Sequence, residues 1–148
     1  MPITWHIHSW ETLSKKMLYE SLALRSLVFV VEQNCVYQDL DSKDENAIHI
    51  LGYNQNVLVA YTRVFLNTKP ASIGRVVIHP LFRRLGYGKL IIQKSIEQAP
   101  TSTPIHISAQ EHLKGFYEKL GFSQAGEGYL EDGIPHIPMV TTANQPNV

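Results

Sequence analysis

A glycine-containing turn at residues 83–88 constrains the fold of this chain more than any other part of its sequence. The turn reads Arg-Arg-Leu-Gly-Tyr-Gly, follows an apolar segment at residues 75–78 that is typical of a strand, and opens a helical pattern. Glycine lets another group approach the backbone closely, and the first N–H groups of a new helix point outward with the positive end of the helix dipole. With two arginines beside it, such a turn favours binding of a cofactor that carries a diphosphate.

Two common phosphate-binding motifs do not match this turn. A Walker loop would need glycine in place of Arg83 and serine or threonine in place of Leu90, and a dinucleotide-binding fingerprint would need glycine or alanine in place of Ile91. Neither motif is therefore expected. From these six residues alone, a phosphate-binding loop of another type and a tight strand-to-helix turn with solvated arginines both stay open.

Length and composition favour a single globular domain. The chain has 148 residues, of which 44% are hydrophobic and 18% charged, and it contains no apolar run long enough to span a bilayer. Thirteen basic residues balance thirteen acidic ones, so no overall field favours nucleic acid as a partner. Cys35 is the one cysteine and no secretory signal is evident, so we expect a cytoplasmic protein without disulfides.

The hydrophobic pattern predicts strands that alternate with three helices. Strands are expected at residues 3–8, 48–53, 57–65, 75–79, 105–109, 122–130 and 134–140. The first helix should begin at Thr12 or Ser14 and carry Leu24, Val28 and Val31 on one face. The second should extend from Leu85 to Ala99 along its apolar face, and the third should cover residues 111–120 and end at Gly121. Residues 141–148 are polar and are expected to be a frayed tail.

A second motif lies about thirty residues after the glycine turn. Residues 116–122 read Phe-Tyr-Glu-Lys-Leu-Gly-Phe. Together with Arg-x-x-Gly-x-Gly at residues 83–88, this segment resembles the paired motifs of the GNAT family of N-acetyltransferases. Residues 28–34, 37–39 and 131–136 resemble the ElaA-like branch of that family, so the resemblance covers nearly the whole chain.

The resemblance implies a fold and a cofactor. The fold would be a single α/β (α+β) domain over residues 1–140, with a central mixed, mostly antiparallel sheet that is splayed between its fourth and fifth strands and flanked by helices. The cofactor would be acetyl-CoA, with its pantetheine arm in the splay and its diphosphate on the amides of the glycine turn. The residues that the resemblance assigns to cofactor binding are Val77, Ile78, Arg83, Arg84, Leu85, Gly86, Tyr87, Gly88, Lys89 and Gln110. The family often has asparagine where this chain has Gln110.

The implied reaction is transfer of an acetyl group from acetyl-CoA to a primary amine by direct attack in a ternary complex. Tyr117 matches the general acid of the family, since a phenol holds its proton at neutral pH and can donate it to a leaving thiolate. The backbone N–H near Ile78 is a candidate donor to the oxyanion. Glu32 and His79 are candidate general bases, although a helix-end carboxylate and a strand-end histidine without a chemical role are alternatives for them.

Other polar residues have two interpretations each. Arg25 interrupts an apolar helix and either binds an acidic group of the acceptor or pairs within the chain, for example with Glu45. The acidic residues 39–45 do not match a calcium loop, and they are either solvated or attract a cationic amine. His136 either lines the mouth of the acceptor site or caps a turn.

No metal site is expected. His6 and His8 share a strand face without the further ligands that a zinc site needs, and Cys35 is expected to be a packing residue. The acceptor is expected to be a small-molecule or peptide amine that the sequence does not identify, with neither nucleic acid nor membrane as partner. A homodimer through an exposed C-terminal strand stays open. The competing hypotheses are a non-catalytic sensor that binds acyl-CoA and a structural adaptor.

Overall fold

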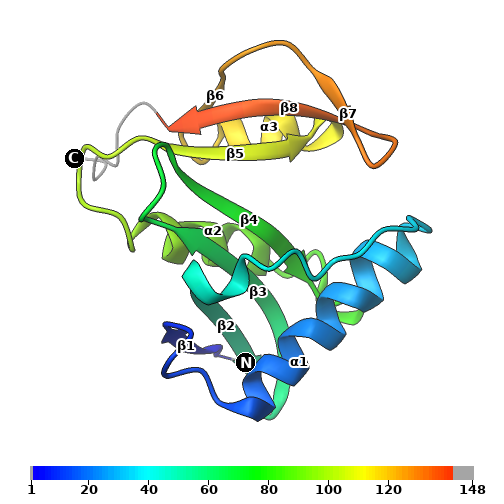
Figure 1. The fold of residues 1–148 in the computed structure, drawn as a ribbon. Helices are drawn as coiled ribbons and strands as arrows, with labels where there is room; N and C mark the ends of the chain where they lie inside the picture. Colours follow the sequence, from blue (N-terminus) through cyan, green and yellow to red (C-terminus); the bar gives the residue numbers. More distant parts are fainter. Residues whose placement is uncertain (1, 142–148) are drawn as a thin grey trace.

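The computed structural model describes residues 2–141, which form one mixed sheet with helices on both faces (Figure 1). The strands are β1 (Thr4–His8), β2 (Ile48–Asn54), β3 (Val57–Phe65), β4 (Ala71–Ile78), β5 (Ile105–Gln110), β6 (Phe122–Gln124), β7 (Tyr129–Glu131) and β8 (Ile134–Thr141). Their order is β1-β2-β3-β4-β5-β8-β6, with β7 paired to β8, and among these described strands only β4 and β5 are parallel. The expected mixed, mostly antiparallel sheet is confirmed.

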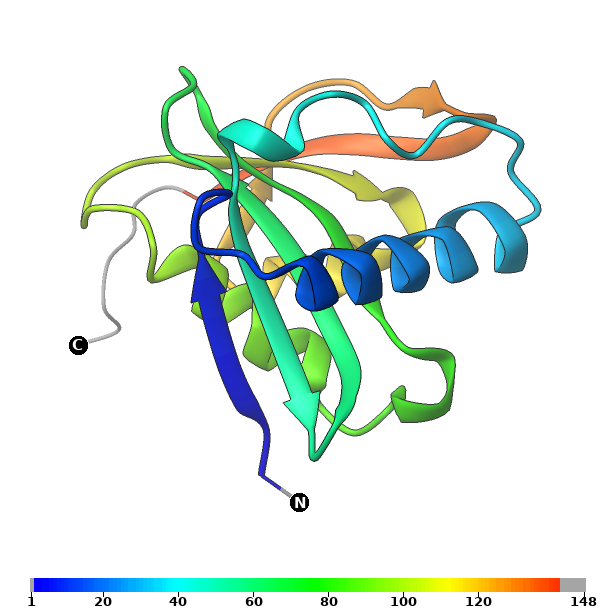
Figure 2. The same ribbon diagram turned by 60° about the horizontal axis from the view of Figure 1, so that its bottom comes forward.

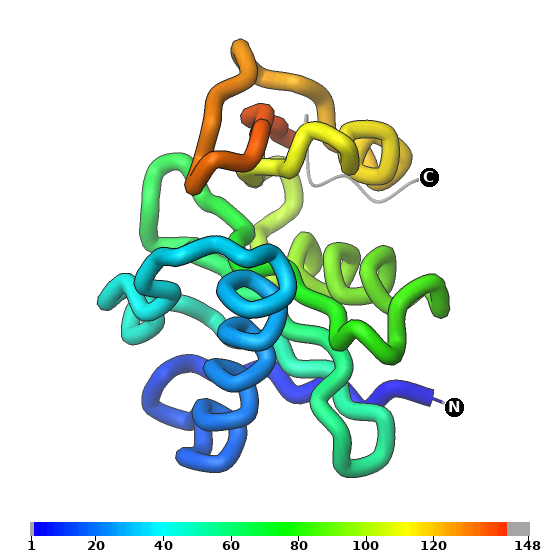
Figure 3. Tube along the Cα trace, turned by 90° about the vertical axis from the view of Figure 1, so that its right-hand side faces the viewer, coloured from blue at the N-terminus to red at the C-terminus, as the bar shows by residue number. Residues whose placement is uncertain are grey.

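The sheet is splayed between β4 and β5. Pairing between them is confined to residues 71–73 of β4 and 105–107 of β5, after which the two strands separate. Figure 1 shows this divergence, and Figure 3 shows the part that contains β5 to β8 standing apart from the N-terminal half. The splay predicted between the fourth and fifth strands is therefore present.

Helices cover both faces of the sheet. The chain forms α1 (Lys15–Arg25), the π-helix η1 (Ser26–Glu32), α2 (Tyr87–Ile96) and α3 (Lys114–Glu118), with short 3₁₀ turns η2 (Asp44–Asn46), η3 (Pro80–Phe82) and η4 (Glu111–Leu113). α1 crosses one face of the sheet and α2 lies on the other (Figures 2 and 3). No helix of residues 2–141 is long and apolar enough to cross a membrane.

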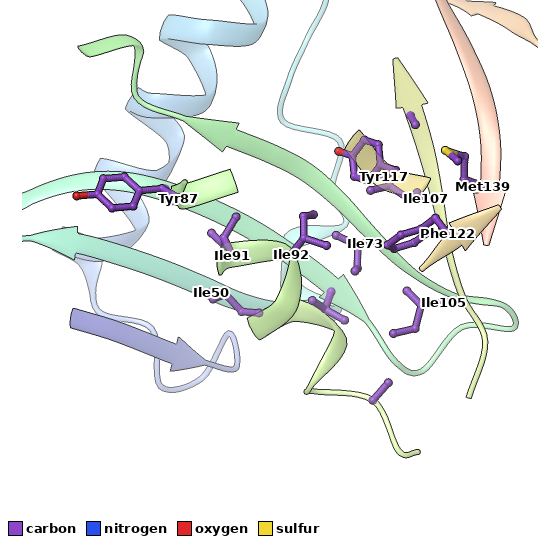
Figure 4. Packing of buried hydrophobic residues seen from close by; sticks show 14 of the residues in the cluster. Ile50, Ile73, Tyr87, Ile91, Ile92, Ile105, Ile107, Tyr117, Phe122 and Met139 are labelled. Atoms are coloured by element: carbon purple, nitrogen blue, oxygen red, sulfur yellow. The ribbon is translucent and has the colours of Figure 1, made fainter. Parts of the chain in front are cut away.

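The two helix faces bury different parts of the core. Ile91 and Ile92 of α2 are fully buried with β2, β3 and β5, and Figure 4 shows them pointing into that layer. Leu24 and Val28 pack on the opposite face beside Val77 of β4. Both faces of β4 are thus packed against apolar side chains, Ile73 on the α2 face and Val77 on the α1 face.

The first helix differs from the expected pattern in its last turns. Ser14 caps it as predicted, because its hydroxyl accepts the N–H of Met17 at 3.1 Å. From Ser26 onward, however, the helix is a π-helix, whose i→i+5 bonds rotate later residues away from a 3.6-residue face. Val28 is therefore buried whereas Val31 is 67% exposed, so the prediction for Val31 was wrong.

Three further boundaries differ from expectation. The helix expected at residues 111–120 consists of the 3₁₀ turn η4 and then α3, which ends at Glu118. Leu85 is 59% exposed and precedes α2, which begins only at Tyr87, so it does not belong to the apolar face of that helix. The strand expected at residues 122–130 is divided into β6 and β7, which both pair with β8. The turn from β7 to β8 contains Asp132 and Gly133 with positive φ, as expected for a tight hairpin.

The C-terminal end of the domain is a strand. Thr141 is the last residue of β8, and its buried hydroxyl accepts the N–H of Ile105 at 3.0 Å. Pairing therefore includes the first residue of the segment that was expected to be frayed. The rest of that segment, residues 142–148, lies outside the described residues.

Candidate active site

The splay opens a cleft of about 770 Å³, which is in the size range of small-molecule sites. The cleft has two sides, named after α2 and η1, two elements that lie on opposite faces of the sheet in Figure 3. The α2 side is formed by Arg83, Gly88, Phe116 and Tyr117, and the η1 side by Phe29, Glu32, Cys35, Asp132 and His136. Val77 and Ile78 of β4 and Gln110 of β5, which are predicted cofactor residues, line the space between them.

The β4 edge of the cleft offers backbone groups. The N–H of His79 donates to the carbonyl of Val59 on β3 at 2.8 Å, so alternation along the strand directs the N–H of Ile78 toward the cleft. A bulge interrupts the β3–β4 register near Arg75, whose φ is +52°. Since β5 has already separated, an extended ligand can bind this free edge as an added strand would.

The glycine turn forms a hollow that joins the cleft. Ile78, Arg83, Gly88 and Phe116 line both the cleft and this hollow of about 230 Å³. Gly86, with φ +86°, is the N-cap of α2, and because Leu90 is the first residue to bond back to it, the preceding helical N–H groups have no partner within the helix.

The hollow fits the phosphate-binding role predicted for it. A Cβ added at Gly88 would already lie 3.4 Å from the ring of Phe116 and would narrow the hollow. The remaining predicted ligands that line it are Arg84, Gly86, Tyr87 and Lys89. Leu85 alone of the predicted cofactor residues lines neither the cleft nor the hollow.

Tyr117 presents a free phenol to the cleft. Its ring packs edge-on against Phe116 and Phe122, with centroids 5.1 and 5.7 Å away. The hydroxyl donates to no other described residue, and Figure 4 shows it pointing away from Phe122 and Met139. Burial raises the pKa of Tyr117 to about 12, so the phenol keeps its proton at neutral pH.

Glu32 and Arg83 pair across the cleft. Nη1 of Arg83 lies 2.7 Å from Oε2 of Glu32, Nη2 binds Oε1, and the two side chains are 40% and 38% exposed. The hydrogen bonds from Arg83 lower the pKa of Glu32. The predicted general base Glu32 and the predicted phosphate ligand Arg83 are thus bound to each other.

His79 lies just beyond the end of β4. Its Nδ1 accepts the N–H of Leu81 at 3.1 Å, and its ring packs edge-on against Phe82. It is not among the residues that line the cleft. The structure therefore brings Glu32 and Tyr117 together in one cleft and leaves His79 beside it.

Arg25 is fully buried and binds carboxylates of its own chain. Its Nε lies 2.9 Å from Oδ2 of Asp39, and its Nη1 lies 2.8 Å from Oδ1 of Asp44. Of the two interpretations of Arg25, pairing within the chain is the one the structure shows, although Glu45 is not the partner in these ion pairs. Asp44, the residue before Glu45, is a partner instead, because η2 turns the Asp44 side chain inward.

The acidic segment is paired rather than solvated. Arg25, from α1, belongs with two more arginines and three aspartates to one ion-pair cluster, consisting of Arg25, Arg63, Arg75, Asp39, Asp41 and Asp44. Burial would raise the pKa of Asp44, but hydrogen bonds from Arg25 and Arg63 lower it overall. The expectation of a solvated loop was wrong, because three arginines from α1, β3 and β4 meet this loop. No sequence motif marks these long-range pairs.

Residues from distant segments meet on the η1 side. Cys35 Sγ donates to the carbonyl of Asp132 at 3.3 Å and so links the end of η1 to the β7–β8 turn. His136 is 7% exposed, lines the cleft, and donates from Nδ1 to the carbonyl of Ile134 at 2.7 Å. His136 thus lines the cleft and also bonds back to the start of β8.

Comparison with known proteins supports the resemblance found in the sequence. The family described as "Acetyltransferase (GNAT) domain" matches residues 15–143. Protein ElaA of Escherichia coli is 41% identical in an alignment that covers 93% of this chain and 95% of that protein. Its crystal structure superposes with a TM-score of 0.88 over 95% of this chain and 99% of the other.

Two further solved structures share the fold. An acyl-CoA N-acyltransferase from Pseudomonas aeruginosa is 34% identical, with a TM-score of 0.87 over 95% of this chain and 99% of that chain. A GNAT family acetyltransferase from Elizabethkingia anophelis, solved with acetyl-CoA bound, is 15% identical and has a TM-score of 0.66 over 95% and 97% of the two chains. By its family match and its identity to these relatives over most of its length, this chain is an acyltransferase of the GNAT acetyltransferase family.

Proposed function

We propose that this protein transfers an acetyl group from acetyl-CoA to a primary amine, by direct attack in a ternary complex. The observation that carries the proposal is the continuity of the site: the cleft that contains Tyr117 opens into the hollow at the start of α2. One extended ligand with a thioester at one end and a diphosphate near the other matches that path. The acetyl-CoA bound to the E. anophelis enzyme, which has the same fold, adds support.

The residues of the α2 side hold the cofactor. Arg83, Arg84 and Lys89 offer positive charge to the diphosphate, and the free N–H groups at the start of α2 offer hydrogen bonds. The main chain of Val77 and Ile78 pairs with the pantetheine arm, and Gln110 contacts it from β5. The Gln110 side chain is longer than the asparagine common in the family, so its contact is the one we expect to differ.

Each chemical requirement of the transfer has a candidate group. The N–H of Ile78 donates to the oxyanion that forms when the amine attacks, and the Tyr117 hydroxyl gives its proton to the departing thiolate. Because a thiolate is itself a fair leaving group, Tyr117 accelerates the step without being indispensable. Glu32 and His79 stay predictions as general bases.

Thermal stability and thiol release together test the proposal. Coenzyme A at one hundred times its dissociation constant should stabilise the protein by about 2.7 kcal/mol. Acetyl-CoA with a panel of primary amines should release free thiol only when enzyme and amine are both present. An unchanged melting temperature at millimolar coenzyme A would overturn the proposal, and binding without turnover on any amine would favour the sensor hypothesis.

The acceptor and the assembly are proposed only as classes. The acceptor is a small-molecule or peptide amine that enters from the η1 side, and we propose a cytoplasmic location. A homodimer stays a prediction that sedimentation would test.

A further inference from the structure

His136 lies where the amine would enter. On β5, Ile107 and Ala109 are buried in the core, whereas Ser108 and Gln110 turn toward the other face and line the cleft. His136 of β8 is paired in register with Gln110 and lines the same cleft. An imidazole therefore stands on the acceptor face, one strand away from the residue assigned to the pantetheine arm.

The hydrogen bond of Nδ1 defines which nitrogen of His136 can accept a proton. A carbonyl oxygen only accepts, so the 2.7 Å contact with Ile134 requires the hydrogen to be on Nδ1. In the neutral ring, Nε2 then carries the lone pair. Stacking on Tyr129, with centroids 6.2 Å apart and planes inclined by 20°, holds the ring in place.

A carboxylate faces the nitrogen that is left free. Oε2 of Glu131 lies 3.6 Å from Nε2, and Oε1 of Glu131 accepts a hydrogen bond from Ser108 at 3.4 Å. Ser108 in turn hydrogen-bonds Tyr129. An imidazolium that forms at His136 would therefore gain an ion pair, and Glu131, whose side chain is 49% exposed, offers a way out to water for the proton.

The two other candidate bases are already engaged. Both oxygens of Glu32 accept hydrogen bonds from Arg83, and its pKa is lowered by them, which makes it a weaker base. His79 uses Nδ1 to accept the N–H of Leu81 and does not line the cleft. By contrast, His136 lines the cleft, and its Nε2 accepts no hydrogen bond from another described residue.

We propose that Nε2 of His136 is the general base that accepts the proton of the acceptor ammonium, with Glu131 as its positioning residue. The proposal rests on the amine acetylation proposed above. The ammonium gives one proton to Nε2, and the neutral nitrogen then bonds to the thioester carbon while the C–S bond breaks. The thiolate takes the proton of the Tyr117 hydroxyl, and the phenolate takes one from the new amide nitrogen. The products are an amide, a thiol and one proton on His136, which passes to water.

The experiment compares two kinds of nucleophile at pH 7. Putrescine, spermidine, lysine amide and glucosamine all carry an ammonium group and need a base, whereas hydroxylamine is neutral and does not. His136→Asn keeps a donor at the position of Nδ1 and removes Nε2. With the best of the four amines we expect kcat of His136→Asn to fall by about 100-fold, the lower end of the usual range for general base catalysis. With hydroxylamine its enzyme-dependent rate should stay within about threefold of wild type, because no proton must be removed before attack.

His106→Asn is the matched control. His106 is on β5, pairs with Val140 of β8, and does not line the cleft, so both of its rates should equal those of wild type. Glu131→Gln should lower the amine rate by about tenfold and spare the hydroxylamine rate. If His136→Asn melts early or loses its thermal shift with coenzyme A, His136→Gln replaces it in the same comparison.

The outcomes separate this proposal from the proposed function. A wild-type enzyme that acetylates neither the amines nor hydroxylamine would overturn the proposed function, and the base assignment with it. An active wild type with equal losses on both nucleophiles, or with no loss, in a folded His136 variant would overturn the base assignment alone. Selective loss on the amines supports it.

Discussion

The two sides of the cleft are built in different ways. On the α2 side, the groups that we assign to the cofactor are mostly backbone N–H groups presented by a turn, a bulged strand and the start of a helix. On the η1 side, the groups are side chains from distant segments, held in place by the ion-pair cluster and by contacts such as that between Cys35 and Asp132, which are 97 positions apart. The α2 side therefore depends on local conformation, and the η1 side depends on the intact tertiary structure.

The largest effect should come from breaking the cluster behind the η1 side. Arg25→Met leaves Asp39 and Asp44 buried with fewer partners, and removal of one member of a buried ion pair typically costs about 3–5 kcal/mol. Chemical denaturation should reveal this loss, whereas Lys15→Met, at an exposed position of α1, should change stability little. If Arg25→Met kept its stability but had a raised KM for the amine, Arg25 would instead be a residue that binds the acceptor.

The same cluster should make the protein sensitive to acid. The folded-state pKa of Asp44 lies below the ordinary value, so its contribution to stability is present above the unfolded pKa and is lost as the pH falls through the folded pKa. Wild type should therefore lose stability below about pH 4. Arg25→Met should show a shallower loss over that range, because Arg25 is one cause of the shift. The same loss of stability at low pH in both proteins would contradict the assignment of this effect to the Arg25–Asp44 pair.

Tyr117 tests the chemistry of the α2 side. Tyr117→Phe removes a hydroxyl that has no hydrogen-bond partner among the described residues, so stability and coenzyme A affinity should hold. The maximal rate should fall by about 100-fold, or about 3 kcal/mol, because the thiolate loses its acid.

Tyr53→Phe is the control for the loss of a phenol. Tyr53 donates to Glu20 at 2.7 Å, away from the cleft, so this variant should lose about 1 kcal/mol of stability and keep its rate. If Tyr117→Phe instead behaves like Tyr53→Phe, Tyr117 is a core residue and not the acid.

This difference between local and tertiary construction also decides how much of each side the sequence predicts. The glycine turn, the Gly121 cap and the Tyr117 helix lie in short contiguous motifs, and the structure has the turn before α2 and a positive φ at Gly121 where they were expected. The burial of Asp39 and the contact between Cys35 and Asp132 depend on segments that meet only in three dimensions. No spacing rule reports such contacts. The prediction that Val31 is buried was wrong for a local reason, since a π-helix breaks the 3.6-residue period on which that prediction rested.

Gly88 tests whether the hollow at the start of α2 is a binding site. Gly88→Val adds a branched side chain where even a Cβ lies 3.4 Å from Phe116, so coenzyme A affinity should fall by about tenfold or more, or at least 1.4 kcal/mol. Gly115→Val is the matched control, because a Cβ at this helical glycine of α3 meets nothing within 4 Å. Titration calorimetry with coenzyme A gives both affinities. Equal affinity in a folded Gly88→Val protein would make the turn merely structural.

The smallest expected effect concerns the ion pair that joins the two sides. If Arg83 binds the diphosphate, the cofactor must compete with Glu32 for its guanidinium. An exposed pair of this kind contributes at most about 1 kcal/mol, so Glu32→Gln should tighten coenzyme A binding by up to about fivefold and barely change stability. Arg83→Gln should weaken binding, and the double variant should bind no more tightly than Arg83→Gln alone, because the benefit of removing Glu32 exists only while Arg83 is present. Additive effects in this cycle would mean that Glu32 repels the diphosphate directly, and that the α2 and η1 sides do not communicate through Arg83.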